Sequence, residues 1–89
     1  MTFEELLVVL KTENISPAQY DVLGCGYVGG EDGFIIENAL GGYNVCYIER
    51  GNKTVLTWVA DEHSACIKLV QEFIDCGEYQ LQKYLERAY

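Results

Sequence analysis

The 89-residue sequence predicts one small α+β domain. Two observations predict this class: apolar residues at helical spacing near both ends of the chain, and β-rich runs between glycines in its middle. From this order we expect a small antiparallel sheet of three strands, or four, with an N-terminal helix and two C-terminal helices packed mainly on one face. The 49% of hydrophobic and 22% of charged residues agree with a folded domain.

The first helix is expected from about Phe3 to Glu13. Thr2 and Glu5 have the Thr-x-x-Glu spacing of a capping box, in which each side chain satisfies a free backbone N–H at the helix start. The apolar stripe of this helix consists of Phe3, Leu6, Leu7 and Leu10. A second, shorter helical turn is expected at residues 16–19, where serine can cap and proline occupies the first helical position.

Three strands are expected next. The glycine-rich segment 24–33 cannot be helical and leads into a strand at Phe34–Glu37. Tyr43–Arg50 and Lys53–Val59 are β-rich runs joined by a tight turn at residues 51–52, although a three-residue turn would exchange the strand partners. With the two-residue turn, the hairpin side expected in the core carries Tyr43, Val45, Tyr47, Leu56 and Trp58.

Two helices complete the chain. Asp61 stands where a helix cap belongs, and Gly77 suits the left-handed residue that ends the helix. The apolar stripe between them comprises Ala65, Cys66, Leu69, Val70, Phe73 and Ile74. A last helix is expected from about Glu78 to Ala88, with Leu81, Tyr84, Leu85 and Ala88 at helical spacing.

The net charge of the chain limits the kinds of partner that it is expected to bind. Fourteen acidic against six basic residues give a formal net charge of −8, which disfavours nucleic acids and anionic membranes and favours basic proteins. The N-terminus is acidic where a secretory signal is basic, and no apolar run approaches the roughly 18 residues of a membrane span. We therefore expect a cytoplasmic protein that does not bind membranes. In that compartment the four scattered cysteines, Cys25, Cys46, Cys66 and Cys76, are expected to be reduced and buried.

Three patterns could indicate a chemical site, but each has a simpler interpretation. Residues 24–29 match Gly-x-Gly-x-x-Gly, yet the following Gly-Glu-Asp-Gly cannot start a helix and would repel phosphate. His63 and Cys66 share a helix face, but the chain has no second histidine and no Cys-x-x-Cys. Paired carboxylates without further ligands indicate solvated surface charge. The sequence predicts no enzyme, no cofactor and no metal site.

One run of sequence resembles a known family. Residues 42–51 form an aromatic-x-Val-x-Tyr-x-Glu-Arg-Gly hairpin, and Glu-x-x-Ala-Cys at residues 62–66 opens a helix. This combination resembles the small immunity proteins of bacterial polymorphic-toxin systems, including contact-dependent growth inhibition systems. The likeness covers roughly residues 15–73, with Tyr43 where tryptophan is expected. It implies a protein that binds a cognate toxin domain, commonly a nuclease, and masks it without covalent chemistry.

The acidic middle of the chain is the expected toxin-binding surface. Residues 21–62 hold seven acids against two bases, and the acids of the glycine-flanked loop can adapt to a partner next to tyrosine anchors. We expect this loop and the strand Phe34–Asn38 to form the edge of the surface. The alternative is an acidic adaptor or regulatory module that binds another basic protein. The residues expected to bind toxin are Tyr27, Glu31, Asp32, Glu37, Tyr43, Glu49, Asp61 and Glu62.

Overall fold

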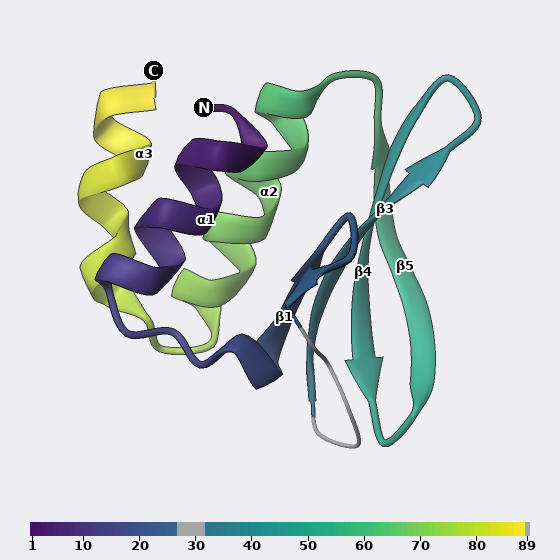
Figure 1. Ribbon diagram of the computed structural model, residues 1–89, viewed down its shortest axis with the longest axis horizontal. Helices are drawn as coiled ribbons and strands as arrows, with labels where there is room; N and C mark the ends of the chain where they lie inside the picture. The colour runs from purple at the N-terminus through teal and green to yellow at the C-terminus, as the bar shows by residue number, and fades with distance from the viewer. Residues whose placement is uncertain (27–31, 89) are drawn as a thin grey trace.

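The computed structural model describes the backbone of residues 1–26 and 32–88, and its fold is α+β (Figure 1). An N-terminal helix is followed by a sheet, a long helix and a broken C-terminal helix. The elements are α1 (Phe3–Thr12), the 3-10 turn η1 (Pro17–Gln19), β1 (Tyr20–Val22), β2 (Cys25–Gly26), β3 (Gly33–Ala39), β4 (Gly42–Glu49), β5 (Asn52–Val59), α2 (Glu62–Asp75), the 3-10 turn η2 (Tyr79–Leu81) and α3 (Gln82–Ala88).

The sheet differs from the predicted one in size and in direction. Its described strands number five, in the order β2-β1-β3-β4-β5, and β1 runs parallel to β3 while the other pairs are antiparallel. The expectation of three or four antiparallel strands was therefore wrong. Tyr20 and Val22 of β1 are buried against the core and pair with Phe34 and Ile36 of β3. A strand of three residues is too short to give a periodic signal in sequence.

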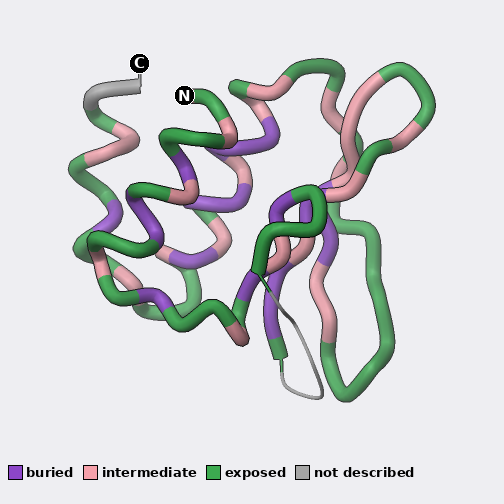
Figure 2. The backbone as a smooth tube through the Cα atoms, viewed as in Figure 1, coloured by how far each residue is buried: buried purple, intermediate pink, exposed green. Residues whose placement is uncertain are grey.

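The α-helices lie together on one side of the sheet, as predicted (Figure 1). Helix α2 is next to the strands and α3 is farthest from them. The buried segments line the space between these two layers, whereas no helix of residues 1–26 and 32–88 lies on the opposite side of the sheet (Figure 2). The central core residues include Leu6, Leu10, Ile36, Val45, Leu69, Val70 and Phe73.

Local capping signals fix the helix starts. The Glu5 N–H donates to Thr2 Oγ1 at 3.2 Å, which confirms the Thr2 half of the predicted capping box. The Glu5 carboxylate accepts from the Thr2 hydroxyl at 3.3 Å and not, as predicted, from a backbone N–H. The Ser64 N–H donates to Asp61 Oδ1 at 2.7 Å, which confirms the cap of α2. The last helix is shorter than expected, because residues 79–81 form a 3-10 turn before α3 begins at Gln82.

The β4–β5 hairpin turns one residue earlier than predicted. Its central residues are Arg50 and Gly51, with φ of 51° and 81°, and Glu49 pairs with Asn52. Positive φ at both central positions is typical of a type I′ turn, whose twist matches that of the strands. In this turn Gly51 is the second central residue, where glycine adopts the positive φ without strain, and Arg50 takes the other positive-φ position.

A β-bulge in β5 then changes the face of the sheet on which the following side chains lie. Val55 pairs with Cys46, but Thr57 pairs with Val45, so that Leu56 is the extra residue. Beyond a bulge, every side chain points to the face opposite to the one that the original register would give it. Trp58 is consequently turned away from the helices, and the prediction that Leu56 and Trp58 lie in the core was wrong. The prediction for β4 was correct, because Tyr43 and Tyr47 pack against the core and Val45 lies in it.

Candidate protein-binding surface

Two of the predicted toxin-binding acids lie at the hairpin end of the sheet. Gly33 pairs with Ile48, which brings the residues that flank this pair, Asp32 and Glu49, to the same end of β3 and β4. Both are exposed, and the Tyr47 hydroxyl donates to Asp32 Oδ2 at 3.3 Å. Burial, and then these two carboxylates, raise the pKa of Tyr47. Tyr27 and Glu31, which were predicted to bind toxin beside them, lie outside the described residues.

Three other predicted residues have structural contacts near the helix starts. Glu62 Oε2 accepts from the Phe3 N–H at 2.9 Å, which ties the first turn of α1 to that of α2. The Tyr43 ring packs edge-to-face on Phe3, with 5.1 Å between ring centroids. Asp61 caps α2, and the hydrogen bond from the Ser64 backbone lowers the pKa of its carboxyl. These contacts give Glu62, Tyr43 and Asp61 each a structural role in the fold.

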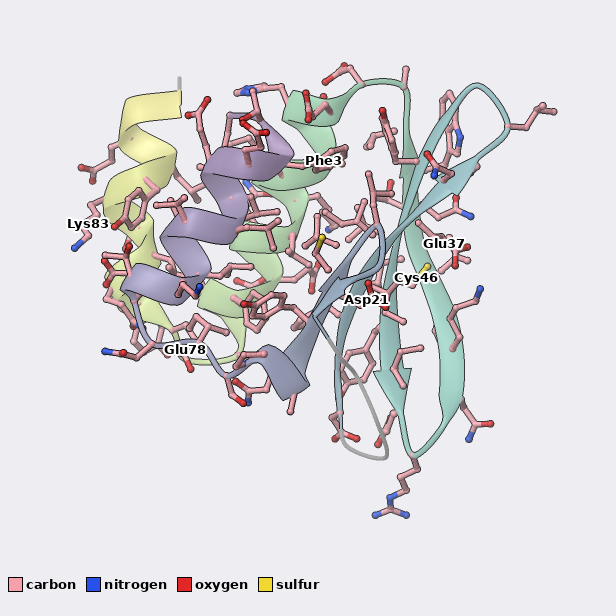
Figure 3. All side chains as sticks on the ribbon, viewed as in Figure 1. Phe3, Asp21, Glu37, Cys46, Glu78 and Lys83 are labelled. Carbon is pink, nitrogen blue, oxygen red and sulfur yellow. The ribbon has the colours of Figure 1, made fainter. Side chains whose placement is uncertain are left out.

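Glu37 lies on the side of the sheet that carries no helix, which we call the outer face. The pairing aligns Glu37, Asn44 and Trp58 in one row across three strands, and Ile35, Cys46 and Val55 in a second row. Figure 3 shows Glu37 and Cys46 on this side, away from the helices. The residues that define the outer face are Ile35, Glu37, Asn44, Cys46, Ile48, Lys53, Val55 and Trp58.

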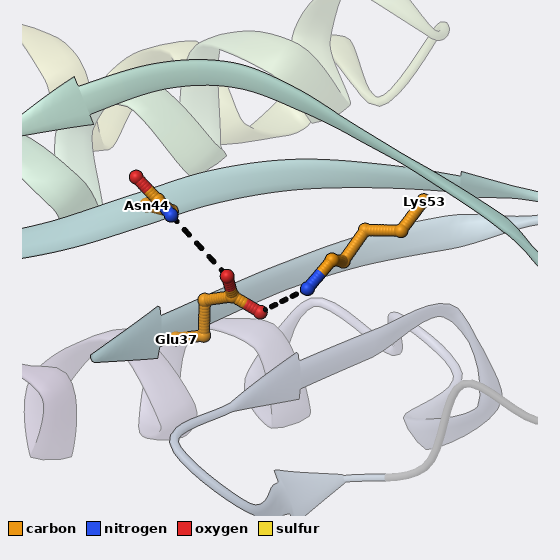
Figure 4. Close-up of polar contacts among 3 residues, drawn as sticks. All are labelled: Glu37, Asn44 and Lys53. Carbon is orange, nitrogen blue, oxygen red and sulfur yellow. Dashed lines mark hydrogen bonds and ion pairs between the residues drawn. The ribbon is translucent and has the colours of Figure 1, made fainter. Parts of the chain in front are cut away.

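A polar cluster crosses the outer face (Figure 4). Lys53 Nζ donates to Glu37 Oε1 at 2.8 Å, and Asn44 Nδ2 donates to Glu37 Oε2 at 3.2 Å. Because Lys53 is on β5 and Glu37 on β3, their ion pair spans β4, where Cys46 is fully buried although it is not part of the helix-side core. The hydrogen bonds from Lys53 and then Asn44 lower the pKa of Glu37, whereas burial raises the pKa of Cys46.

Beside this cluster, the outer face exposes apolar area. Half of the surface of Trp58 and of Val55 is exposed, and Leu40 in the β3–β4 turn is fully exposed. The Trp58 ring lies directly on Gly42, since a Cβ there would come within 2.8 Å of Trp58 Cζ2 and 2.2 Å of the Val59 carbonyl oxygen. With Leu56 these residues account for four of the seven large hydrophobic side chains that are exposed in the described part of the chain.

A groove continues the surface toward β1. It has a volume of about 390 Å³ and is lined by carboxylates and apolar groups together. Asp21 and Glu37 supply its negative charge, and Lys53 also lines it. The further lining residues are Leu23, Gly24, Ile35, Ile36 and Asn38. This combination suits a cationic side chain better than an anionic one.

Cys66 and His63, which share a face of α2, lie in different surroundings, the thiol buried and the imidazole exposed. Burial raises the pKa of the Cys66 thiol to about 12, so a reactive thiolate is strongly disfavoured beside His63. His63 Nδ1 instead lies 2.7 Å from the N-terminal amine. Within residues 1–26 and 32–88, no group of three or more side chains is arranged to hold a metal ion, and no helix is long and apolar enough to cross a bilayer.

The cysteines differ from one another in exposure. All four are free, and Cys46 and Cys66 are buried as predicted. Cys25 on β2 and Cys76 after α2 are exposed, so the expectation that all four are buried was wrong. Their positions at a sheet edge and at a helix end explain this difference.

Comparison of the chain with protein-family models, curated proteins and solved structures finds no significant match.

The sequence does not predict the outer face as a binding surface, because the bulge that turns Trp58 outward has no sequence signature. Gly42 leaves room for the tryptophan ring, but a glycine in a sequence does not indicate which side chain lies on it.

Proposed function

We propose that this chain is a cytoplasmic immunity protein that binds one cognate toxin domain, a basic nuclease, and neutralises it by non-covalent masking. The observation that carries the proposal is the outer face of the sheet, on which no described helix packs and where Trp58 on β5 is half exposed. Together with the net charge of −8, this face offers a basic protein both an apolar anchor and complementary charge. The resemblance of the hairpin and of the α2 start to immunity proteins supports the same function.

The apolar part of the outer face fits a protein partner. Tryptophan is enriched among the residues that dominate binding energy, and such residues sit where apolar area is flanked by polar groups. Here Trp58, Val55 and Leu40 are flanked by Glu37 and Asn44. The buried core lies on the helix side of the sheet, so the exposed parts of these side chains remain open to a partner.

The charge of the chain fits the proposed mode of action. A nuclease attracts phosphates with a basic surface, and an acidic inhibitor associates with such a surface rapidly through electrostatic steering. Asp32 and Glu49 extend the negative charge to the hairpin end of the sheet. No catalytic group is required, because masking needs only shape and charge complementarity.

The test is co-expression of the chain with the toxin domain encoded beside its gene. Cells that produce both should grow, and the emission of Trp58, the single tryptophan, should shift to the blue when the purified proteins mix. Trp58→Ala should weaken protection, whereas Tyr79→Ala, which removes an exposed aromatic ring outside the outer face, should not.

Three outcomes would contradict parts of the proposal. Failure of the wild-type chain to protect cells would refute the immunity function. Binding without protection would favour the acidic adaptor instead. Full protection by Trp58→Ala would show that the toxin binds another surface.

A further inference from the structure

The Glu37–Lys53 pair is a contact that a partner can open. The two side chains are 32% and 46% exposed, and the pair lies on the outer face without a helix above it. Ion pairs exposed to this degree contribute little to stability, because water screens them and ordering two long side chains costs entropy. Losing the contact therefore costs the fold little, although the carboxylate stays in place.

The carboxylate itself is held firmly. Asn44 Nδ2 donates to Oε2, and the residues flanking Glu37 pair with β4 over the whole length of β3. Lys53 reaches the other oxygen with a flexible stem from β5, across β4. A competing cation can therefore replace the Lys53 ammonium on the Glu37 carboxylate, which is already held in position.

An arginine side chain fits this position better than lysine does. The guanidinium group is planar and can donate two parallel hydrogen bonds to one carboxylate, whereas an ammonium acts as a point charge. The groove beside Glu37 adds the Asp21 carboxylate and the apolar surface of Ile35, along which the stem of an arginine can lie.

We propose that Lys53 occupies, in the free protein, the position on Glu37 that an arginine of the basic partner takes in the complex. Docking then exchanges the two cations on Glu37. This inference rests on the proposed function in one respect, namely that a basic protein docks on the outer face. The exchange keeps Glu37 paired in the free and the bound protein, so that no carboxylate is left buried without a cation when the interface closes. Trp58 and Val55 supply the apolar contacts next to it.

The proposal predicts effects of opposite sign for the two members of the pair. Lys53→Met removes the competing ammonium but keeps a stem over Cys46, so arginine should bind more tightly. Glu37→Gln removes the acceptor charge, so arginine should bind more weakly. A purely structural pair would change binding only by the amount that follows from the change in net charge, which matched variants elsewhere on the chain can measure.

The probe is an acetylated and amidated hexa-arginine peptide, titrated into the ¹⁵N-labelled full chain and followed by NMR. Resonances of Glu37, Asn44 and the Trp58 indole should shift saturably, and hexa-lysine should bind more weakly. Lys53→Met should tighten binding roughly two- to fivefold, the size expected for release of one exposed ion pair. Glu37→Gln should weaken binding roughly fivefold or more.

The matched controls are Lys68→Met and Glu72→Gln. These residues form an ion pair on α2 with the same 2.8 Å separation, and each substitution changes the net charge by the same amount as its counterpart on the outer face. Neither control should change the affinity by more than the general charge effect.

Several results would overturn the inference: the absence of a saturable shift, shifts confined to the helix side, or equal effects of Lys53→Met and Lys68→Met. A Glu37→Gln variant that binds as well as Glu72→Gln would also overturn it. The peptide titration does not involve the toxin, so its failure is distinguishable from failure of the wild-type chain to neutralise the toxin.

Discussion

Replacing Phe73 with alanine removes the side chain that joins α2 to the sheet. Phe73 is 4% exposed, and its ring packs edge-to-face on Phe34 with 5.0 Å between centroids. The Phe34 ring lies in turn 5.3 Å from that of Tyr47. The chain of three rings links α2 to β3 and β4, so the substitution opens a cavity between the two layers of the fold.

The expected loss of unfolding free energy is about 3–5 kcal/mol, the usual cost of removing a buried phenylalanine and leaving a cavity. About 0.5–1.5 kcal/mol of this comes from the aromatic pair. A domain of 89 residues has a total stability of roughly 4–13 kcal/mol. The variant therefore loses a large share of its stability and is partly unfolded at 25 °C if the wild type lies in the lower part of that range.

The assay is urea denaturation followed by far-UV circular dichroism, with Phe73→Leu as a second variant that stays folded. Phe73→Leu should lose about 1–2 kcal/mol, because it keeps most of the apolar volume but not the ring pair. Tyr79→Ala, at an exposed aromatic residue, should stay within about 0.5 kcal/mol of the wild type. A loss below about 1 kcal/mol for Phe73→Ala would refute the packing described here.

Three further predictions follow from particular contacts. Gly42→Ala should lower the urea midpoint measurably, because its Cβ would meet the Val59 carbonyl oxygen at 2.2 Å, and an unchanged midpoint would contradict this close approach. With iodoacetamide at pH 8.5, exposed Cys25 should be alkylated within minutes while Cys66, with a pKa of about 12, stays unmodified by mass spectrometry until the chain is unfolded. The hydrogen bond from the Tyr84 hydroxyl, and then that from Lys83, lower the pKa of Glu13 in the folded state. The ionised Glu13 carboxylate therefore stabilises the fold above pH 4.5, and this stabilisation is lost as the pH falls and the carboxylate is protonated. The stability difference between the wild type and Glu13→Gln should accordingly shrink in denaturation curves below pH 4.5, and a constant difference would exclude this linkage.

The order of the main elements could be predicted from sequence because its signals are local. Thr2 and Asp61 each satisfy backbone N–H groups within three residues of themselves, so their spacing is enough to mark the helix starts. The apolar stripe of α2 repeats over four turns and therefore identifies its buried face, including Leu69 and Phe73.

The sheet could be predicted only in part because its details depend on distant partners. β1 is held by parallel pairing with β3 and by burial of Tyr20, neither of which has a signal in three residues. The bulge at Leu56 depends on how β5 fits β4, and it decides the side on which Trp58 lies.

The same reason limits prediction of the surface. Acidic residues can be counted in a sequence, but a carboxylate that caps a helix and one that is open to a partner look alike. Glu62 bonds the Phe3 backbone, whereas Glu37 lies on the outer face, and only the contacts tell them apart.

The position of β5 at the edge of the sheet has a consequence for solubility. No strand of the described residues pairs with its outer edge, and an eight-residue edge strand with Val55, Leu56 and Trp58 exposed can template pairing between copies of the chain. The bulge at Leu56 interrupts a regular ladder near the middle of that edge, and the charge of Lys53 opposes stacking of identical strands. A chain that lacks the extra residue would present a continuous edge for pairing. Such a chain would aggregate at high concentration because one strand had become regular, although its core packing was unchanged.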